Sequence, residues 1–130
     1  MDDAWARRVQ YDDEPVLVII EGLTIYLSEA DVQKIFEIID GKFKHATVLA
    51  EVMNPFIVKH IKEKSIDKSH AKFSWGIKNG KVLADKLPHF SWVADHSLAE
   101  GMAVFMPAYR VLRRIPLIAN VSNKIVVLRK

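Results

Sequence analysis

The side chains best suited to chemistry in this sequence include a carboxylate and a phenol that follow one apolar run. Glu21 comes directly after Pro15–Ile20, and Tyr26 lies a short way beyond it. If the run is a parallel strand, Glu21 stands at its carboxyl end, where open α/β sheets bind ligands. A carboxylate buried there needs a partner, which a ligand's ammonium group or a backbone amide could supply. Tyr26 combines an apolar ring with a polar tip, which suits the wall of a pocket or the core over the sheet.

The histidines do not indicate a metal site. None of the five is spaced i, i+4 with another, and the chain has no cysteine, which excludes disulfides, thiolate ligands and cysteine nucleophiles. We therefore expect no bound metal. His89 and His96 are candidates for a general base, because a pKa of about 6.5 suits proton removal at neutral pH. Packing or surface roles are the commoner alternative for such histidines.

Composition and charge limit the partners. Half of the 130 residues are hydrophobic and 27% are charged, which is typical of one globular domain. The net charge is +3. The basic residues are scattered along the sequence, which argues against a surface that binds nucleic acid. The basic stretch Lys59–Lys72 could attract an anionic partner, but a solvated helix face is the ordinary interpretation. Without a signal pattern or an apolar run of about 18 residues, we expect no membrane partner and a cytoplasmic location.

A strand, a helix and a second strand must position Glu21 and Tyr26. The β-branched run Pro15–Ile20 lacks polar alternation, which predicts a parallel strand buried on both faces. Ser28 can cap a following helix, and Gly41 is a candidate for its left-handed stop. Ala46–Val52 predicts a second buried strand. Together these elements make a right-handed βαβ unit.

The second half of the sequence gives weaker signals. Phe56–Lys62 favours a helix, and Lys78–Lys81 favours a turn. Met102–Phe105 and Lys124–Leu128 predict two strands, which we expect to pair antiparallel at one edge of the sheet. Pro107–Pro116 between them fits either a short helix or an irregular crossing.

Two segments carry a family resemblance. Ile20–Leu27 reads Ile-Glu-Gly-Leu-Thr-Ile-Tyr-Leu and precedes the capped helix, and Phe73–Gly80 reads Phe-Ser-Trp-Gly-Ile-Lys-Asn-Gly. In this order they resemble the leucine carboxyl methyltransferase and tetracenomycin-type polyketide O-methyltransferase family, whose class I enzymes use S-adenosylmethionine. The resemblance covers nearly the whole chain. It implies an α/β fold that is the C-terminal half of a Rossmann-like methyltransferase sheet. That half holds strands four to seven, mostly parallel with one antiparallel edge strand, flanked by helices.

The resemblance also implies a function and site residues. The complete protein would transfer a methyl group from S-adenosylmethionine to a hydroxyl or carboxyl oxygen of a small-molecule acceptor. The matching positions for cofactor binding are Glu21, Gly22 and Asp3, and those for substrate binding are Tyr26 and Trp75. For Glu21 the alternative is a structural carboxylate that orders the following loop. For Trp75, which could join an aromatic wall, it is ordinary core packing, and Asp3 stands near a chain end, where residues often fray.

One expected part of the fold is missing from the sequence. A dinucleotide-like site needs closely spaced glycines after a strand, and none of the five glycines forms such a pair. We therefore expect residues 1–130 to be one partial methyltransferase domain without the glycine-rich cofactor-binding half, and its activity as an enzyme stays open. The strand at 16–20 would then be an exposed edge that recruits another strand. We expect a homodimer through that edge, or assembly with a separate N-terminal half.

Overall fold

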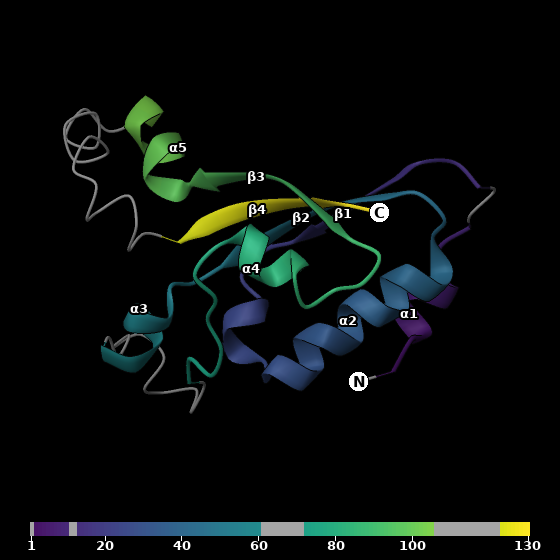
Figure 1. Ribbon diagram of the computed structural model, residues 1–130, viewed down its shortest axis with the longest axis horizontal. Coiled ribbons are helices and arrows are strands. Elements are labelled where there is room, and N and C mark those ends of the chain that lie inside the picture. Colours follow the sequence, from purple (N-terminus) through teal and green to yellow (C-terminus); the bar gives the residue numbers. More distant parts are fainter. Residues whose placement is uncertain (1, 11–12, 61–71, 106–122) are drawn as a thin grey trace.

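A mixed four-stranded sheet with helices packed on one face organises the chain in a computed structural model (Figure 1). The structure describes residues 2–10, 13–60, 72–105 and 123–130. Its elements, in chain order, are α1 (Ala4–Arg7), β1 (Val16–Ile20), the 3-10 helix η1 (Thr24–Tyr26), α2 (Glu29–Lys42), β2 (Ala46–Val52), α3 (Pro55–His60), α4 (Gly80–Ala84), β3 (Ser91–Ser97), α5 (Leu98–Phe105) and β4 (Lys124–Arg129).

The strands are arranged in the order β1-β2-β4-β3. β1 and β2 are parallel, and β4 is antiparallel to both of its neighbours, so β3 points the same way as β1 and β2. The expected mixed sheet with one antiparallel strand is confirmed in this coarse form. The antiparallel strand, however, is not at the edge. β4 lies between β2 and β3 because it pairs with both of them along its length.

The predicted strand, helix and strand are confirmed with nearly the expected bounds. Ser28 begins α2 through a reciprocal capping box, in which its hydroxyl accepts from the Asp31 amide at 3.1 Å. The Ser28 hydroxyl donates to the carboxylate of Asp31, and this bond holds the pKa of Asp31 below its usual range. The helix continues through Gly41 to Lys42, and the only positive-φ glycine among the described residues is Gly22, so the left-handed stop predicted at Gly41 is wrong.

The predictions for the second half needed correction. Met102–Phe105 lies inside helix α5 and is not a strand, and the strand that pairs with β4 on the side away from β2 is Ser91–Ser97. The strand predicted at Lys124–Leu128 is confirmed as β4. Asn79 caps the start of α4, so the turn signal there marks a helix start. The segment Pro107–Pro116 lies outside the described residues, as does the end of the predicted helix beyond His60.

The core lies between the sheet and the helices α2 and α4. It is built from the inward-facing side chains of the strands together with the apolar face of α2 and Leu83 of α4. Along β2, every second residue is buried and those between are only partly covered. In β1, Leu17 and Ile19 are 58% and 64% exposed. The expectation of a strand buried on both faces is therefore wrong for β1, whose second face is open.

Candidate functional site

The loop after β1 turns sharply at Gly22. This residue has φ +62°, a left-handed conformation that glycine adopts without the steric cost of a Cβ atom. Nothing lies within 4 Å of the position that a Cβ would take, so the backbone is open to an approaching group. The loop follows the carboxyl end of a parallel strand, which is where the sequence predicted a ligand site.

Glu51, which is not among the site residues predicted from the sequence, fixes this loop. Its Oε2 accepts a hydrogen bond from the Gly22 amide at 2.9 Å, and its Oε1 accepts one from Asn123 Nδ2 at 2.9 Å. The hydroxyl of Thr24, a residue only 1% exposed, donates to the Glu51 carbonyl. One residue therefore ties together the ends of β1 and β2, η1 and the residue before β4. Glu21 was predicted as a site residue because its carboxylate stands at the end of a buried strand. Glu51 stands near the end of β2, so the same signal could have identified it.

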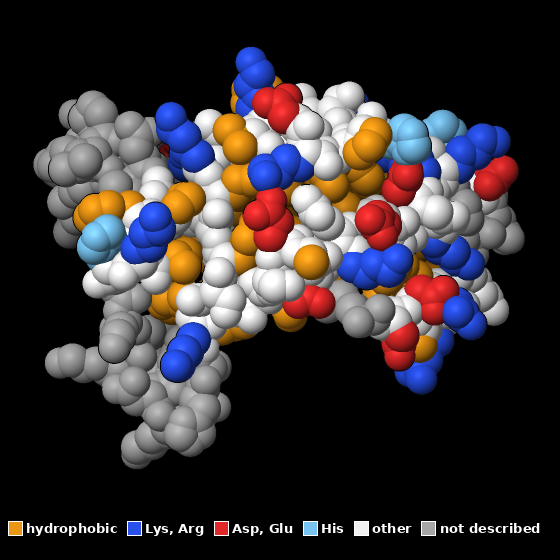
Figure 2. All heavy atoms as spheres, turned by 60° about the horizontal axis from the view of Figure 1, so that its bottom comes forward, with side chains coloured by type: hydrophobic (Ala, Val, Ile, Leu, Met, Phe, Trp, Pro, Cys, Tyr) orange, Lys and Arg blue, Asp and Glu red, His pale blue; other side chains and the backbone are white. Residues whose placement is uncertain are grey.

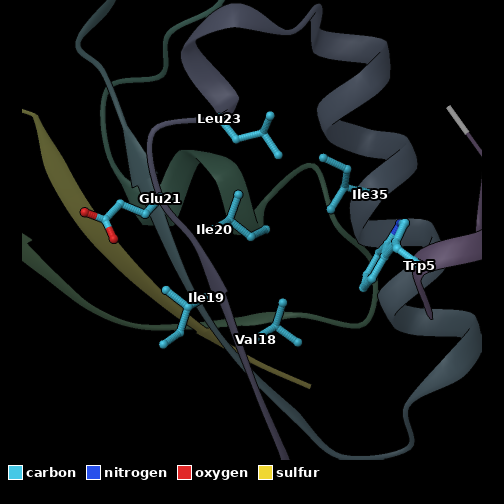
Figure 3. Close-up of a pocket in the computed structure, with 7 residues that line it drawn as sticks. All are labelled: Trp5, Val18, Ile19, Ile20, Glu21, Leu23 and Ile35. Atoms are coloured by element: carbon cyan, nitrogen blue, oxygen red, sulfur yellow. The ribbon is translucent and has the colours of Figure 1, made fainter. Parts of the chain in front are cut away.

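Glu21 is exposed and lies on the open side of the sheet. In Figure 3, Glu21 and Ile19 point to one side of β1, whereas Val18 and Ile20 point toward Trp5 and α2. These residues, with Leu23 and Ile35, line an apolar hollow of about 420 Å³ beside the edge strand. The carboxylate is thus available to a ligand on the open face, and the hollow is suited to apolar groups.

Tyr26 lies at the same end of the sheet, next to the second family-like segment. Its side chain is 38% exposed, and its ring centroid is 5.8 Å from that of Phe73. The Ser74 amide donates to the carbonyl of Ile25 at 2.8 Å, so residues 73–74 lie against η1. The two motifs that are far apart in the sequence are therefore adjacent in space.

A close approach of the Met53 carbonyl to Gly76 fixes the rest of the segment Phe73–Gly80. The Ile77 amide donates to the carbonyl of Met53 at 2.9 Å. A Cβ on Gly76 would come within 2.7 Å of the same carbonyl oxygen and 2.8 Å of Val58 Cγ2, so only glycine fits there. Trp75, which directly precedes Gly76, is 7% exposed and belongs to the core cluster. The structure thus places Trp75 in the core, beside the site and not in an open pocket.

Asp3 lies apart from Glu21 and Gly22. It precedes α1 and forms an ion pair with Arg7 at 2.6 Å, and this guanidinium holds the pKa of Asp3 below its usual range. It lines a hollow with Gly41 and Lys42, at the end of α2 away from the β1 loop. The structure therefore does not bring Asp3 together with the other residues predicted to bind the cofactor.

The candidate bases also lie elsewhere. His89 Nδ1 is 2.6 Å from the carboxylate of Asp40 near the end of α2, and His96 Nδ1 is 3.9 Å from Glu100. Hydrogen bonds from Lys130 and then His89 hold the pKa of Asp40 below its usual range. Within the described ranges, no three histidine or acidic side chains are placed to hold a metal ion.

The other expectations concern surfaces. Among the aromatic side chains near the end of the sequence, Phe90 packs edge-on against Phe36 in the core, whereas Trp92 is 46% exposed. Most of the basic stretch Lys59–Lys72 lies outside the described residues. On the face shown in Figure 2, basic and acidic side chains alternate without a continuous basic patch among the coloured residues. Among the described helices, none has the length and apolar character to cross a membrane.

Comparison with curated proteins gives two relatives. The chain is 28% identical over 95 residues to the S-adenosyl-L-methionine-dependent methyltransferase dpfgK of Gibberella zeae. It is 30% identical over 90 residues to the tetracenomycin polyketide synthesis O-methyltransferase TcmP of Streptomyces glaucescens. The resemblance to S-adenosylmethionine-dependent methyltransferases is confirmed. No family model matches the sequence, and no solved structure matches it.

The similarity to these methyltransferases is partial in length. The matches cover 67% and 68% of this chain, but only 32% and 33% of the two relatives. The chain therefore spans about a third of the length of the curated methyltransferases that it matches. The mixed α/β sheet flanked by helices is consistent with part of a methyltransferase domain.

Proposed function

We propose that this chain is part of an S-adenosylmethionine-dependent O-methyltransferase, which methylates a hydroxyl or carboxyl oxygen of a small molecule. The observation that carries the proposal is the Gly22 loop at the carboxyl end of β1, with exposed Glu21 on one side and Tyr26 nearby. The similarity to two methyltransferases supports it. The chain is one partial domain in this proposal, and a glycine-rich loop would come from another part of the site.

The residues of the β1 loop fit the cofactor. When bound, S-adenosylmethionine supplies a methyl group on a positively charged sulfur. Glu21 would accept hydrogen bonds from the ammonium group of the cofactor, because its carboxylate is exposed on the open face. Gly22 would let the backbone come close to the ligand, since no atom lies within 4 Å of its Cβ position. The main task of the protein would be to hold the two reactants in line.

Tyr26 is proposed to contact the acceptor. Its ring lies beside Phe73, and together they offer an apolar surface with a hydroxyl at its rim. A planar, partly aromatic acceptor would suit this surface. Trp75 would support it from the core, because its side chain is buried next to the same segment.

Calorimetric titration of the purified chain with S-adenosylmethionine tests this function. We expect weak binding at millimolar ligand, because this chain would supply only one side of the site. Glu21→Gln should weaken binding about tenfold or more, since a hydrogen bond to a charged group is lost. Glu14→Gln, a control before β1, should bind like the parent protein. No heat and no thermal shift with the parent protein would mean that this chain does not act as proposed.

A second candidate function is assembly through β1. This strand ends the described sheet, its side chains Leu17 and Ile19 are mostly exposed, and Ile19 lines the apolar hollow. An unpaired apolar edge tends to recruit another strand. We propose a homodimer in which two copies of β1 pair antiparallel about a two-fold axis.

Sedimentation measures this assembly directly. We expect the parent protein to be a dimer and Ile19→Lys to be a monomer, because a lysine on the edge strand opposes strand addition. Val104→Lys is the matched control, since Val104 is 71% exposed on α5, away from β1. A monomeric parent protein at high micromolar concentration would contradict the homodimer, and a separate partner strand would then be the remaining form of this candidate.

A further inference from the structure

Glu51 and Glu21 occupy the same level of two neighbouring strands. The last register pair of β1 and β2 is Ile20 with Ala50, and each of these two residues is followed in the sequence by a glutamate. Because side chains alternate along a strand, both glutamates follow buried residues and share the open face. Their surroundings differ. Glu51 is bound by the Gly22 amide and by Asn123, whereas Glu21 is exposed.

This difference suggests a division of roles. The two Glu51 bonds come from segments 29 and 72 residues away along the sequence, so the carboxylate closes long-range contacts. Bonds from an amide to a charged carboxylate are shorter and stronger than neutral ones. The Gly22 bond constrains the peptide that directly follows Glu21. The conformation that presents Glu21 therefore depends on an acceptor at position 51.

We propose that Glu51 is a positioning residue of the candidate methyl-donor site. Its carboxylate fixes the loop Glu21–Leu23 and couples this loop through Asn123 to the start of β4. The effect of Glu51 on cofactor binding rests on the proposed function. The contact with the loop itself stands on the geometry alone. Glu51 touches no reacting atom in this role and acts through Glu21.

Amide hydrogen exchange tests the position of the loop without any ligand. In Glu51→Ala, the Gly22 amide should exchange about tenfold faster or more relative to the amide of Val48, which lies in the centre of β2 and is fully buried. A general loss of stability would accelerate the exchange of both amides by the same factor. Glu51→Gln should restore part of the protection, because its side-chain oxygen can still accept from Gly22. Glu37→Ala, an exposed carboxylate of α2, is the control.

Titration with S-adenosylmethionine adds the functional result. The proposal expects Glu51→Ala to bind about tenfold more weakly or worse, with Glu51→Gln in between. Equal acceleration of both amides overturns it, and so does unchanged binding in Glu51→Ala when Gly22 exchanges faster. If the parent protein shows no binding, the proposed function fails, and the exchange of Gly22 still decides whether Glu51 holds the loop.

Discussion

Removing the charge of Asp40 should destabilise the fold by an amount that depends on pH. Its carboxylate is 2.7 Å from Lys130 Nζ and 2.6 Å from His89 Nδ1, and the Asp40 and Lys130 side chains are only 26% and 20% exposed. These contacts join the end of α2 to the end of β4. Lys130 also donates to the carbonyls of Asp40 and Phe43 at the end of the same helix. Asp40→Asn keeps the size of the side chain and removes only its charge.

The magnitude follows from the exposure of each partner. A hydrogen bond to a charged group contributes about 1.5–3 kcal/mol when sheltered, whereas a pair with an exposed partner contributes less than about 1 kcal/mol. Lys130 is the sheltered partner, and His89 is 66% exposed. We therefore expect Asp40→Asn to lower the free energy of unfolding by about 2 kcal/mol at pH 7. For a domain of this size, that corresponds to a melting temperature lower by about 7 °C.

The sign of the pH dependence follows from the lowered pKa of Asp40. Its pKa in the unfolded chain is about 3.9, so its contribution is fully present above that value. It is lost as the pH falls through the lower pKa of the folded protein. The stabilities of the parent protein and Asp40→Asn should therefore differ at neutral pH and converge in acid.

Urea unfolding followed by tryptophan fluorescence measures both effects. Asp85→Asn, an exposed aspartate after α4, is the control and should change the midpoint little. Equal stability of Asp40→Asn and the parent protein at pH 7 would refute the reasoning. A difference that grows as the pH falls would refute the assigned sign.

Two further predictions concern single backbone positions. Ser28→Ala should lower the free energy of unfolding by about 1 kcal/mol, because the capping box of α2 is lost, whereas Ser91→Ala on exposed β3 should have little effect in the same urea titration. Gly80→Ala should cost about 1–3 kcal/mol, since its Cβ would meet Asp95 and lie 2.8 Å from Trp92 Cδ1. Gly101→Ala in α5 should be neutral or slightly stabilising, because open space surrounds the position of its Cβ. Thermal melting measures both variants, and a lower melting temperature for Gly101→Ala than for Gly80→Ala would contradict this packing.

The first half of the fold could be predicted because each element carries its own local signal. The β-branched run gives β1, and the capping serine with the acidic first turn gives the start of α2. Ala46–Val52 gives β2 with its full bounds. The openness of the second face of β1 could not be predicted, because it depends on what packs there and not on the strand itself.

The tail could not be predicted for two physical reasons. A short apolar run such as Met102–Phe105 fits a buried strand and a helix equally well. β3 reads Ser-Trp-Val-Ala-Asp-His-Ser, and an irregularity between Trp92 and Ala94 breaks its alternation, so it lacks the pattern of a strand. Its pairing with β4 comes from tertiary contacts that are distant in the sequence.

The candidate site was predictable in part. Glu21, Gly22 and Tyr26 follow one strand, so local order in the sequence brings them together. Glu51 was missed because the bonds that define its role join residues far apart in the sequence. Asp3 was assigned by resemblance alone.

The interior position of β4 has a consequence for how the chain folds during synthesis. This strand comes after every other described element, yet it separates β2 from β3 in the finished sheet. While residues 124–129 are still inside the ribosome, the βαβ unit can form, but β3 has no partner strand. The sheet can therefore close only after β4 has left the ribosome, and until then the edges of β2 and β3 that β4 covers stay exposed to pairing with other chains.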